Sequence, residues 1–126
     1  MTLYEAYFDG SAKPNPGIMT IGGLIKKQGS TSIHSFSEEL GYGTNNVAEY
    51  LAFIRLVNDA IKLDIKTIKI YGDSALVVNQ VNRAWQANSK MRPYRNKAIL
   101  LLEEIDTWQL EHIKRGLNME ADSLTR

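Results

Sequence analysis

Apolar residues in the first part of the chain gather in short runs of the kind that form β-strands. Three such runs cover residues 3–9, 18–27 and 32–41. The first two are rich in aromatic and aliphatic side chains, whereas the apolar residues of the third alternate only loosely with polar ones. Short segments containing Gly, Pro, Asn or Ser separate the runs. Because the connections are short, we expect the three strands to form an antiparallel meander.

After these strands, apolar residues recur at every third or fourth position instead of at about every second position. Apolar side chains at these steps predict an amphipathic helix over residues 46–63: Val47, Leu51, Ile54, Val57 and Ile61. Further elements follow in the order strand 67–73, short helix 74–81, helix 93–106 and strand 108–114. Pro93 suits the first turn of the third helix, and Asn118 is expected to be the N-cap of a last helix.

This order of elements predicts an α/β fold built on one sheet. The fourth strand follows a helix, so it should be parallel to a neighbouring strand. The simplest arrangement is a five-stranded mixed sheet in the order 3-2-1-4-5, with helices on both faces. Open sheets of this kind bind ligands at the carboxyl ends of the strands where the chain changes direction. With 126 residues and neither repeat nor linker, we expect a single domain over residues 1–126.

The composition narrows the class of protein. Apolar residues make up 44% of the chain and charged residues 23%, as in soluble globular proteins. There is no cysteine, which excludes disulfides and thiolate-bound zinc. The apolar runs are too short to span a bilayer, and the first residues lack the features of a signal peptide. We therefore expect a cytoplasmic protein.

Cationic side chains are concentrated in one stretch, although the net charge is only +1. Residues 82–98 contain no acid but five cations: Arg83, Lys90, Arg92, Arg95 and Lys97. Trp85 and Tyr94 are interleaved among them. Taken alone, the stretch is best interpreted as a solvated connector. The alternative is a strip that contacts the phosphates of a nucleic acid.

Four carboxylates are predicted at one end of the sheet. Asp9 and Asp73 end the first and fourth strands, and Glu49 and Asp122 lie in the first turns of two helices. If the two strands are parallel neighbours, their ends lie about 5 Å apart. Two carboxylates at that distance repel each other unless one is protonated or a cation lies between them. Oxygen ligands of this kind select Mg²⁺ or Mn²⁺.

Each acid also has a purely structural interpretation. Glu49 fits the spacing of a capping box that begins at Asn46. Asp73 fits the N-cap of the helix that follows it, and Asp122 is a favourable charge near a helix N-terminus. Asp9 fits a turn. For any one residue alone these interpretations are favoured, but they do not explain why all four acids meet at the same end of one sheet.

The residues around these acids resemble the type 1 ribonuclease H family, whose members cut the RNA strand of RNA–DNA hybrids. The matching stretches cover nearly the whole chain and appear in the family's order: Asp9-Gly10-Ser11 with Asn15-Pro16-Gly17, Thr44 to Glu49, Asp73-Ser74, and Asn118 to Leu124. The stretch Thr44-Asn45-Asn46-Val47-Ala48-Glu49, combined with all four acids, is the most specific of these signals.

The resemblance implies a role for each matching position. Two divalent ions, Mg²⁺ or Mn²⁺, would be held around the scissile phosphate by the four acids: Asp9, Glu49, Asp73 and Asp122. Contacts to the hybrid are implied for Gly10, Ser11, Asn15, Thr44, Asn45, Asn46 and Ser74. Such contacts recognise shape and the 2′-hydroxyl, so cleavage should be largely independent of sequence.

The chain departs from well-studied members of the family at three places. Well-studied bacterial members carry a His in the loop before the last acid, but the corresponding residues 114–120 contain no His. Arg115 is the candidate to replace it, as an Arg does in members with a shorter loop. Many members insert a basic protrusion that binds the DNA strand, but the corresponding segment, residues 81–93, is short here. Trp85 therefore either belongs to a reduced form of this protrusion or only covers the core. Tyr42 stands where some relatives place an Arg. Fewer basic contacts predict weaker binding and a shallower dependence on salt.

The leading hypothesis is an endonuclease that hydrolyses the RNA strand of RNA–DNA hybrids with two metal ions. The resemblance implies products with 5′-phosphate and 3′-hydroxyl ends, and a monomer that needs no protein partner. One alternative is a non-catalytic nucleic-acid-binding module on the same fold. Another is a nuclease of the wider superfamily that also cuts double-stranded RNA. The presence of all four acids favours an enzyme, and the Thr44-Asn45-Asn46 stretch favours the hybrid.

Overall fold

The computed structural model describes residues 2–126, which form one five-stranded sheet with helices on both faces. The strands are β1 (Tyr4–Ala12), β2 (Gly17–Lys27), β3 (Ser32–Gly43), β4 (Thr67–Gly72) and β5 (Thr107–His112). Their order across the sheet is β3-β2-β1-β4-β5, which confirms the arrangement expected from the sequence. β1, β2 and β3 are antiparallel, and β4 is parallel to both β1 and β5.

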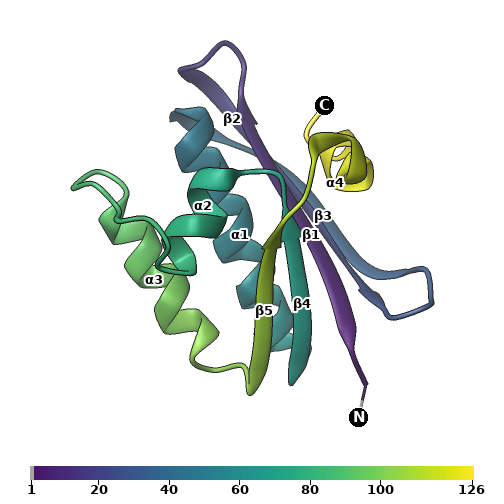
Figure 1. The fold of residues 1–126 in the computed structure, drawn as a ribbon. Coiled ribbons are helices and arrows are strands. Elements are labelled where there is room, and N and C mark those ends of the chain that lie inside the picture. Colours follow the sequence, from purple (N-terminus) through teal and green to yellow (C-terminus); the bar gives the residue numbers. More distant parts are fainter. Residues whose placement is uncertain (1) are drawn as a thin grey trace.

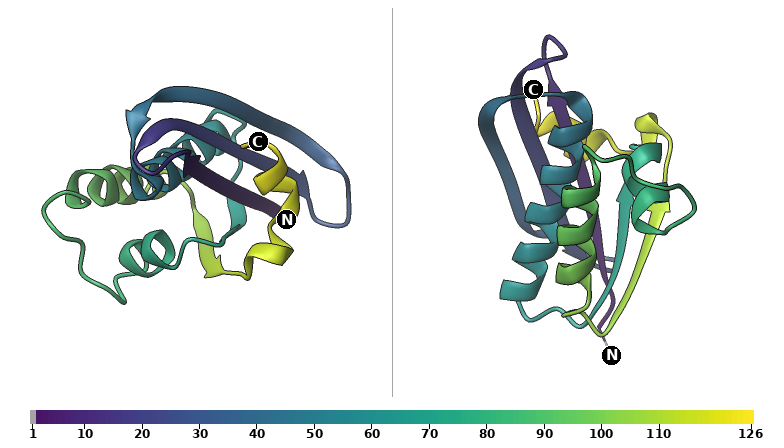
Figure 2. Two further views of the ribbon diagram at one scale, coloured as in Figure 1. Left: turned by 90° about the horizontal axis from the view of Figure 1, so that it is seen from above. Right: turned by 90° about the vertical axis from the view of Figure 1, so that its left-hand side faces the viewer.

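The helices are divided unequally between the two faces of the sheet (Figures 1 and 2). One face carries α1 (Asn45–Lys62), α2 (Ala75–Val81) and α3 (Arg92–Leu102). The short helix α4 (Met119–Ser123) packs on β1 and β2 from the other face, after a 3₁₀ turn over Arg115–Leu117. Among residues 2–126, no helix combines the length and the apolar character needed to cross a membrane.

The core lies between the sheet and α1, because alternate residues of the central strands face this helix. Phe8 of β1 and Phe53 of α1 are fully buried and meet edge to face, with their ring centroids 5.2 Å apart. Ile68 and Ile70 of β4 are buried on the same side. This packing fixes where β1, β4 and α1 present their ends, which is where the acidic residues lie.

Two element boundaries differ by three residues or more from those expected. Strand β1 does not end at Asp9: it continues to Ala12, paired with β2 throughout, although its parallel pairing with β4 stops at Phe8 opposite Gly72. The helix expected over 93–106 ends at Leu102, because the N–H groups of Glu104 and Ile105 bond three residues back instead of four. Ile105 remains buried all the same, as its place in the apolar pattern indicated.

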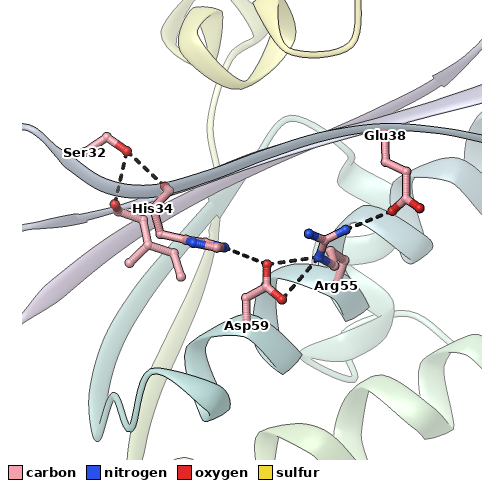
Figure 3. A network of polar contacts seen from close by, with 6 residues as sticks. Ser32, His34, Glu38, Arg55 and Asp59 are labelled. Carbon is pink, nitrogen blue, oxygen red and sulfur yellow. Dashed lines mark hydrogen bonds and ion pairs between the residues drawn. The ribbon is translucent and has the colours of Figure 1, made fainter.

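A polar network ties the edge strand β3 to α1 (Figure 3). Asp59 of α1 is buried. Its Oδ2 lies 2.7 Å from Nε2 of His34 and also accepts a hydrogen bond from Nε of Arg55. Arg55 extends the network by donating to Glu38 at 2.8 Å and lies over the ring of Phe36. His34 therefore has a structural contact here, on β3.

The Asp59→Ala variant is expected to lose about 1.5–3 kcal/mol of unfolding free energy, because charged hydrogen bonds to a buried carboxylate disappear. Truncating Glu38, the exposed end of the same network, should cost less than about 1 kcal/mol. Urea denaturation of both variants measures the two values. Equal losses would contradict the assignment of Asp59 as the centre of the network.

Candidate active site

Three carboxylates from three different elements converge where β1 and β4 part. Asp9 lies in β1, Asp73 directly follows β4, and Glu49 comes from the first half of α1. One ligand oxygen from each lies within 4.8 Å of the other two. Asp9 and Asp73 meet because the parallel ladder ends at Phe8 and Gly72, which leaves these acids as the next residues on the two strands. Asp9 and Glu49 are both buried.

Gly10 allows Glu49 to reach this cluster. A Cβ atom at Gly10 would lie 2.3 Å from the carbonyl oxygen of Ala48, far inside contact distance, so only glycine lets α1 approach β1 so closely. The Gly10 N–H donates to Oε1 of Glu49. The glycine thus places the helix and also fixes the carboxylate.

The Gly10→Ala variant is therefore expected to lower the unfolding free energy by about 2–3 kcal/mol or more, since the backbone of α1 must move away. Gly41→Ala is the matched control, because a Cβ atom at Gly41 meets nothing within 4 Å. Chemical denaturation should show the control within about 0.5 kcal/mol of the wild type. A Gly10→Ala protein as stable as the control would disprove the close approach.

The structural interpretations of Glu49 and Asp73 as helix caps are wrong. The N-cap of α1 is Thr44, whose hydroxyl accepts from the Val47 N–H. The N-cap of α2 is Ser74, whose hydroxyl accepts from the Val77 N–H. Neither Glu49 nor Asp73 therefore caps a helix. Their carboxylates are oriented toward Asp9 instead.

Burial and mutual repulsion disturb the ionisation of the cluster. Burial raises the pKa of Asp9 to about 6, with further contributions from the charges of Asp73 and Asp122. Burial raises the pKa of Glu49 to about 10, and the charges of Asp9 and Asp73 add to the effect. Three ionised carboxylates at this spacing need a cation between them. Oxygen-only donors fit Mg²⁺ or Mn²⁺, so the residues present suit the ions implied by the resemblance.

Asp122 lies at the rim of the cluster and is paired with cations. Its Oδ2 is 2.9 Å from Nη2 of Arg126, and its Oδ1 is 3.7 Å from Nη2 of Arg115. The hydrogen bond from Arg126 is the main reason why the pKa of Asp122 is lowered. The carboxylate of Asp122 also interacts with that of Asp9. The lowered pKa favours the ionised form of Asp122, whereas burial drives Asp9 and Glu49 toward the neutral form.

The cluster forms the wall of an open cavity of about 500 Å³. Ten of the residues singled out in the sequence line this cavity: Asp9, Gly10, Ser11, Asn45, Asn46, Glu49, Asp73, Ser74, Arg115 and Asp122. A cavity lined by carboxylates together with Asn, Ser and Arg side chains suits a polar ligand better than an apolar one, and an anionic ligand once cations offset the carboxylates.

The comparisons with known proteins agree with this geometry. The model of a family described as "Reverse transcriptase-like" matches residues 7–126. Ribonuclease HI of Halobacterium salinarum is 35% identical over 121 residues, which are 95% of this chain and 61% of that protein. The crystal structure of RNase H1 from H. salinarum NRC-1 superposes with a TM-score of 0.93 at 34% identity, covering 97% of this chain and 93% of that one. The chain belongs to the ribonuclease H family.

A second structure in this family was solved with nucleic acid. LC11-RNase H1 in complex with an RNA/DNA hybrid superposes with a TM-score of 0.89 at 30% identity, covering 96% of this chain and 92% of that one. The chain spans only part of some curated relatives. It covers 32% of the length of the bifunctional protein Rv2228c of Mycobacterium tuberculosis, to which it is 30% identical over 118 residues.

Three residues named from the sequence as ribonuclease H substrate contacts lie outside the lining of the cavity. Asn15 and Thr44 are close to it, and Oδ1 of Asn15 accepts from the Asn45 N–H at 3.0 Å. This bond and that from Ala12 N–H to Oδ1 of Asn45, at 2.7 Å, join the β1–β2 turn to the start of α1. Trp85 lies half-exposed in the connection between α2 and α3, outside the cavity.

Several residues in or beside the site of this ribonuclease H chain were not predicted from the sequence. Lys13 lines the cavity and was not singled out, although its place in the loop after Asp9 gave a signal. His112 lies outside the lining of the cavity, with Nε2 3.2 Å from the carbonyl oxygen of Asp73, which agrees with the structural role expected from the sequence. Asn118, expected only as a helix cap, makes no capping bond and is buried against the acids, as is Thr125.

Proposed function

We propose that this protein is a metal-dependent endonuclease that hydrolyses the RNA strand of RNA–DNA hybrids and leaves 5′-phosphate and 3′-hydroxyl ends. The observation that carries the proposal is the convergence of Asp9, Glu49 and Asp73 on one cavity, with Asp122 at its rim. Membership of the ribonuclease H family supports it, and so does the hybrid bound by LC11-RNase H1.

The acids act by binding and positioning. Asp9, Glu49, Asp73 and Asp122 would hold two Mg²⁺ or Mn²⁺ ions. When bound, such ions lower the pKa of a coordinated water and offset the negative charge that develops on the phosphate. The carboxylates fix where that charge is offset, and Asp122 remains ionised because Arg126 and Arg115 are close to it.

The remaining residues would hold the substrate. Side chains of Ser11, Asn45, Asn46 and Ser74 line the cavity with hydroxyl and amide groups that suit phosphate oxygens and 2′-hydroxyls. Asn15 and Thr44 would contribute by fixing the turn and the helix start beside them.

Two further residues, the cationic Arg115 and the aromatic Trp85, have more peripheral proposed roles. Arg115 is largely exposed at the rim, so its guanidinium is free to exchange Asp122 for a phosphate of the substrate or product. Trp85 would contact the hybrid only if the bound duplex extended beyond the cavity to the α2–α3 connection, and otherwise covers the core.

We also propose that the protein is a cytoplasmic monomer that binds no membrane and needs no protein partner.

Competition between labelled duplexes tests the proposed function. Equal concentrations of an RNA–DNA hybrid, a double-stranded RNA and a double-stranded DNA of one sequence are incubated with Mg²⁺ or Mn²⁺. We expect the RNA strand of the hybrid to be cut first and at many positions. Preferential cleavage of double-stranded RNA would favour a nuclease of the wider superfamily, and binding of the hybrid without cleavage would favour a non-catalytic module.

A further inference from the structure

The side chain of Asn118 bridges two strands behind the acidic cluster. It is 1% exposed, and its Nδ2 donates to the carbonyl oxygen of Phe8 at 2.9 Å and to Oδ2 of Asp73 at 3.4 Å. Its two N–H groups are thus both used, one on β1 and one on the acid that follows β4. A buried amide with this pair of partners holds Asp73 at a fixed position relative to β1.

Thr125 has a matching position beside Asp9. It is 4% exposed, and its hydroxyl lies 3.2 Å from Oδ2 of Asp9 and 2.8 Å from the carbonyl oxygen of Asp122. The hydroxyl has one proton, and an ionised carboxylate is a stronger acceptor than a peptide carbonyl. The proton will therefore turn to Asp9 when that acid is ionised, as it must be to bind a cation.

Both contacts come from one short segment, residues 118–125, which packs on the face of the sheet opposite α1 and also carries Asp122. We propose that Asn118 and Thr125 are positioning residues of the metal site, which orient Asp73 and Asp9 before a cation binds. This proposal rests on the proposed function, because it assumes that these acids bind divalent cations.

Preorganisation is the physical reason for such contacts. Carboxylates that repel each other will rotate apart unless other groups hold them. Part of the binding free energy of a cation is then used to reorient them, so the cation binds more weakly. Residues that hydrogen-bond to metal ligands typically change metal affinity or activity by about 10–100-fold when they are removed. Here the segment that supplies Asp122 would also orient two of the three clustered acids, so that three of the four ligands are set by one docked element.

Binding of Mn²⁺ alone tests the proposal without substrate. Isothermal titration calorimetry well below the melting temperature compares the wild type with Thr125→Val, Thr125→Ser and Asn118→Leu. Val and Leu keep approximately the shape and remove the donors, whereas Ser keeps the hydroxyl. The control is Ser123→Ala, because the exposed hydroxyl of Ser123 donates to the Glu120 carbonyl within the same helix.

We expect the Mn²⁺ dissociation constant to rise about 10-fold in Thr125→Val and at least as much in Asn118→Leu, and to stay within about 2-fold of the wild type in Thr125→Ser and Ser123→Ala. In hybrid cleavage, kcat at fixed Mn²⁺ should fall while KM for the hybrid stays the same. Asn118→Leu also removes the hydrogen bond to the Phe8 carbonyl and will melt lower, so Thr125→Val is the variant that decides.

The two possible failures are distinguishable. If the wild type binds Mn²⁺ and cleaves the hybrid but Thr125→Val binds Mn²⁺ equally well, the positioning role is overturned and the proposed function stands. If Thr125→Val melts lower in chelator with an unchanged Mn²⁺ dissociation constant, the residue only packs the core, and the proposal is again overturned. A wild type that neither binds Mn²⁺ nor cleaves would overturn both.

Discussion

Replacing Asp73 by Asn is expected to lower the rate of hybrid cleavage by at least about 10²–10³-fold, as does the loss of one charge-stabilising group in other active sites. The substitution keeps the size of the side chain and keeps an acceptor for Asn118, so the site should retain its shape. What it removes is a negative charge that the proposed mechanism uses to hold a cation. Initial rates at saturating Mg²⁺ and Mn²⁺ measure the effect.

The matched control for this variant is Asp106→Asn, the same change at an exposed acid just before β5, at the other end of the sheet from the cluster. It should leave the rate unchanged. In chelator, Asp73→Asn should melt at the same temperature as the wild type or higher, because it relieves repulsion with Asp9. A variant that retains a tenth or more of wild-type activity would argue against a catalytic role for Asp73.

Replacing Glu49 by Gln is expected to stabilise the protein in chelator, and increasingly so as the pH rises. The folded protein raises the pKa of Glu49 to about 10, above the value of an unfolded glutamate. Between those two pKa values the unfolded chain releases the proton more readily, so stability is lost as the pH rises. The limiting slope for one group is about 1.4 kcal/mol per pH unit. Gln cannot ionise and keeps an oxygen to accept from Gly10.

The difference in melting temperature between Glu49→Gln and the wild type isolates this group, because other titrations contribute equally to both proteins. In chelator it should widen between pH 5 and pH 8, by up to about 5 °C per pH unit for a domain of this size. Added Mn²⁺ should stabilise the wild type more than the variant and reduce the gap. A difference that stays constant with pH would mean that Glu49 ionises normally in the folded protein.

The sheet order could be predicted because it follows from few rules. Short connections impose the antiparallel meander, and a helical crossover imposes the parallel fourth strand. The extent of β1 was not predictable in the same way. Beyond Phe8 the strand pairs with β2 and no longer with β4, and polar residues with Gly10 conceal that pairing in the sequence. The end of α3 was missed because Ile105 continues the apolar spacing after the helical hydrogen bonds have stopped.

The acidic cluster could be located because Asp9 and Asp73 follow the last paired residues of two neighbouring parallel strands, and Glu49 lies near the start of α1. The choice between capping and clustering could not be made from spacing, since Thr44 and Ser74 compete for the same caps. The contacts of Asn118 and Thr125 could not be found at all. They depend on how residues 118–125 dock on the sheet, and in the sequence both residues resemble ordinary polar helix-end residues.

The most direct test of the account is the chemistry of the ends that the protein produces from an RNA–DNA hybrid. The hybrid, labelled in its RNA strand, is incubated with the wild type in Mg²⁺, in Mn²⁺ and in chelator. Activation of water at the carboxylate cluster predicts cleavage that requires the cation and leaves 3′-hydroxyl ends that a polymerase can extend. Cleavage that persists in chelator, or RNA products that end in a 2′,3′-cyclic phosphate, would contradict it.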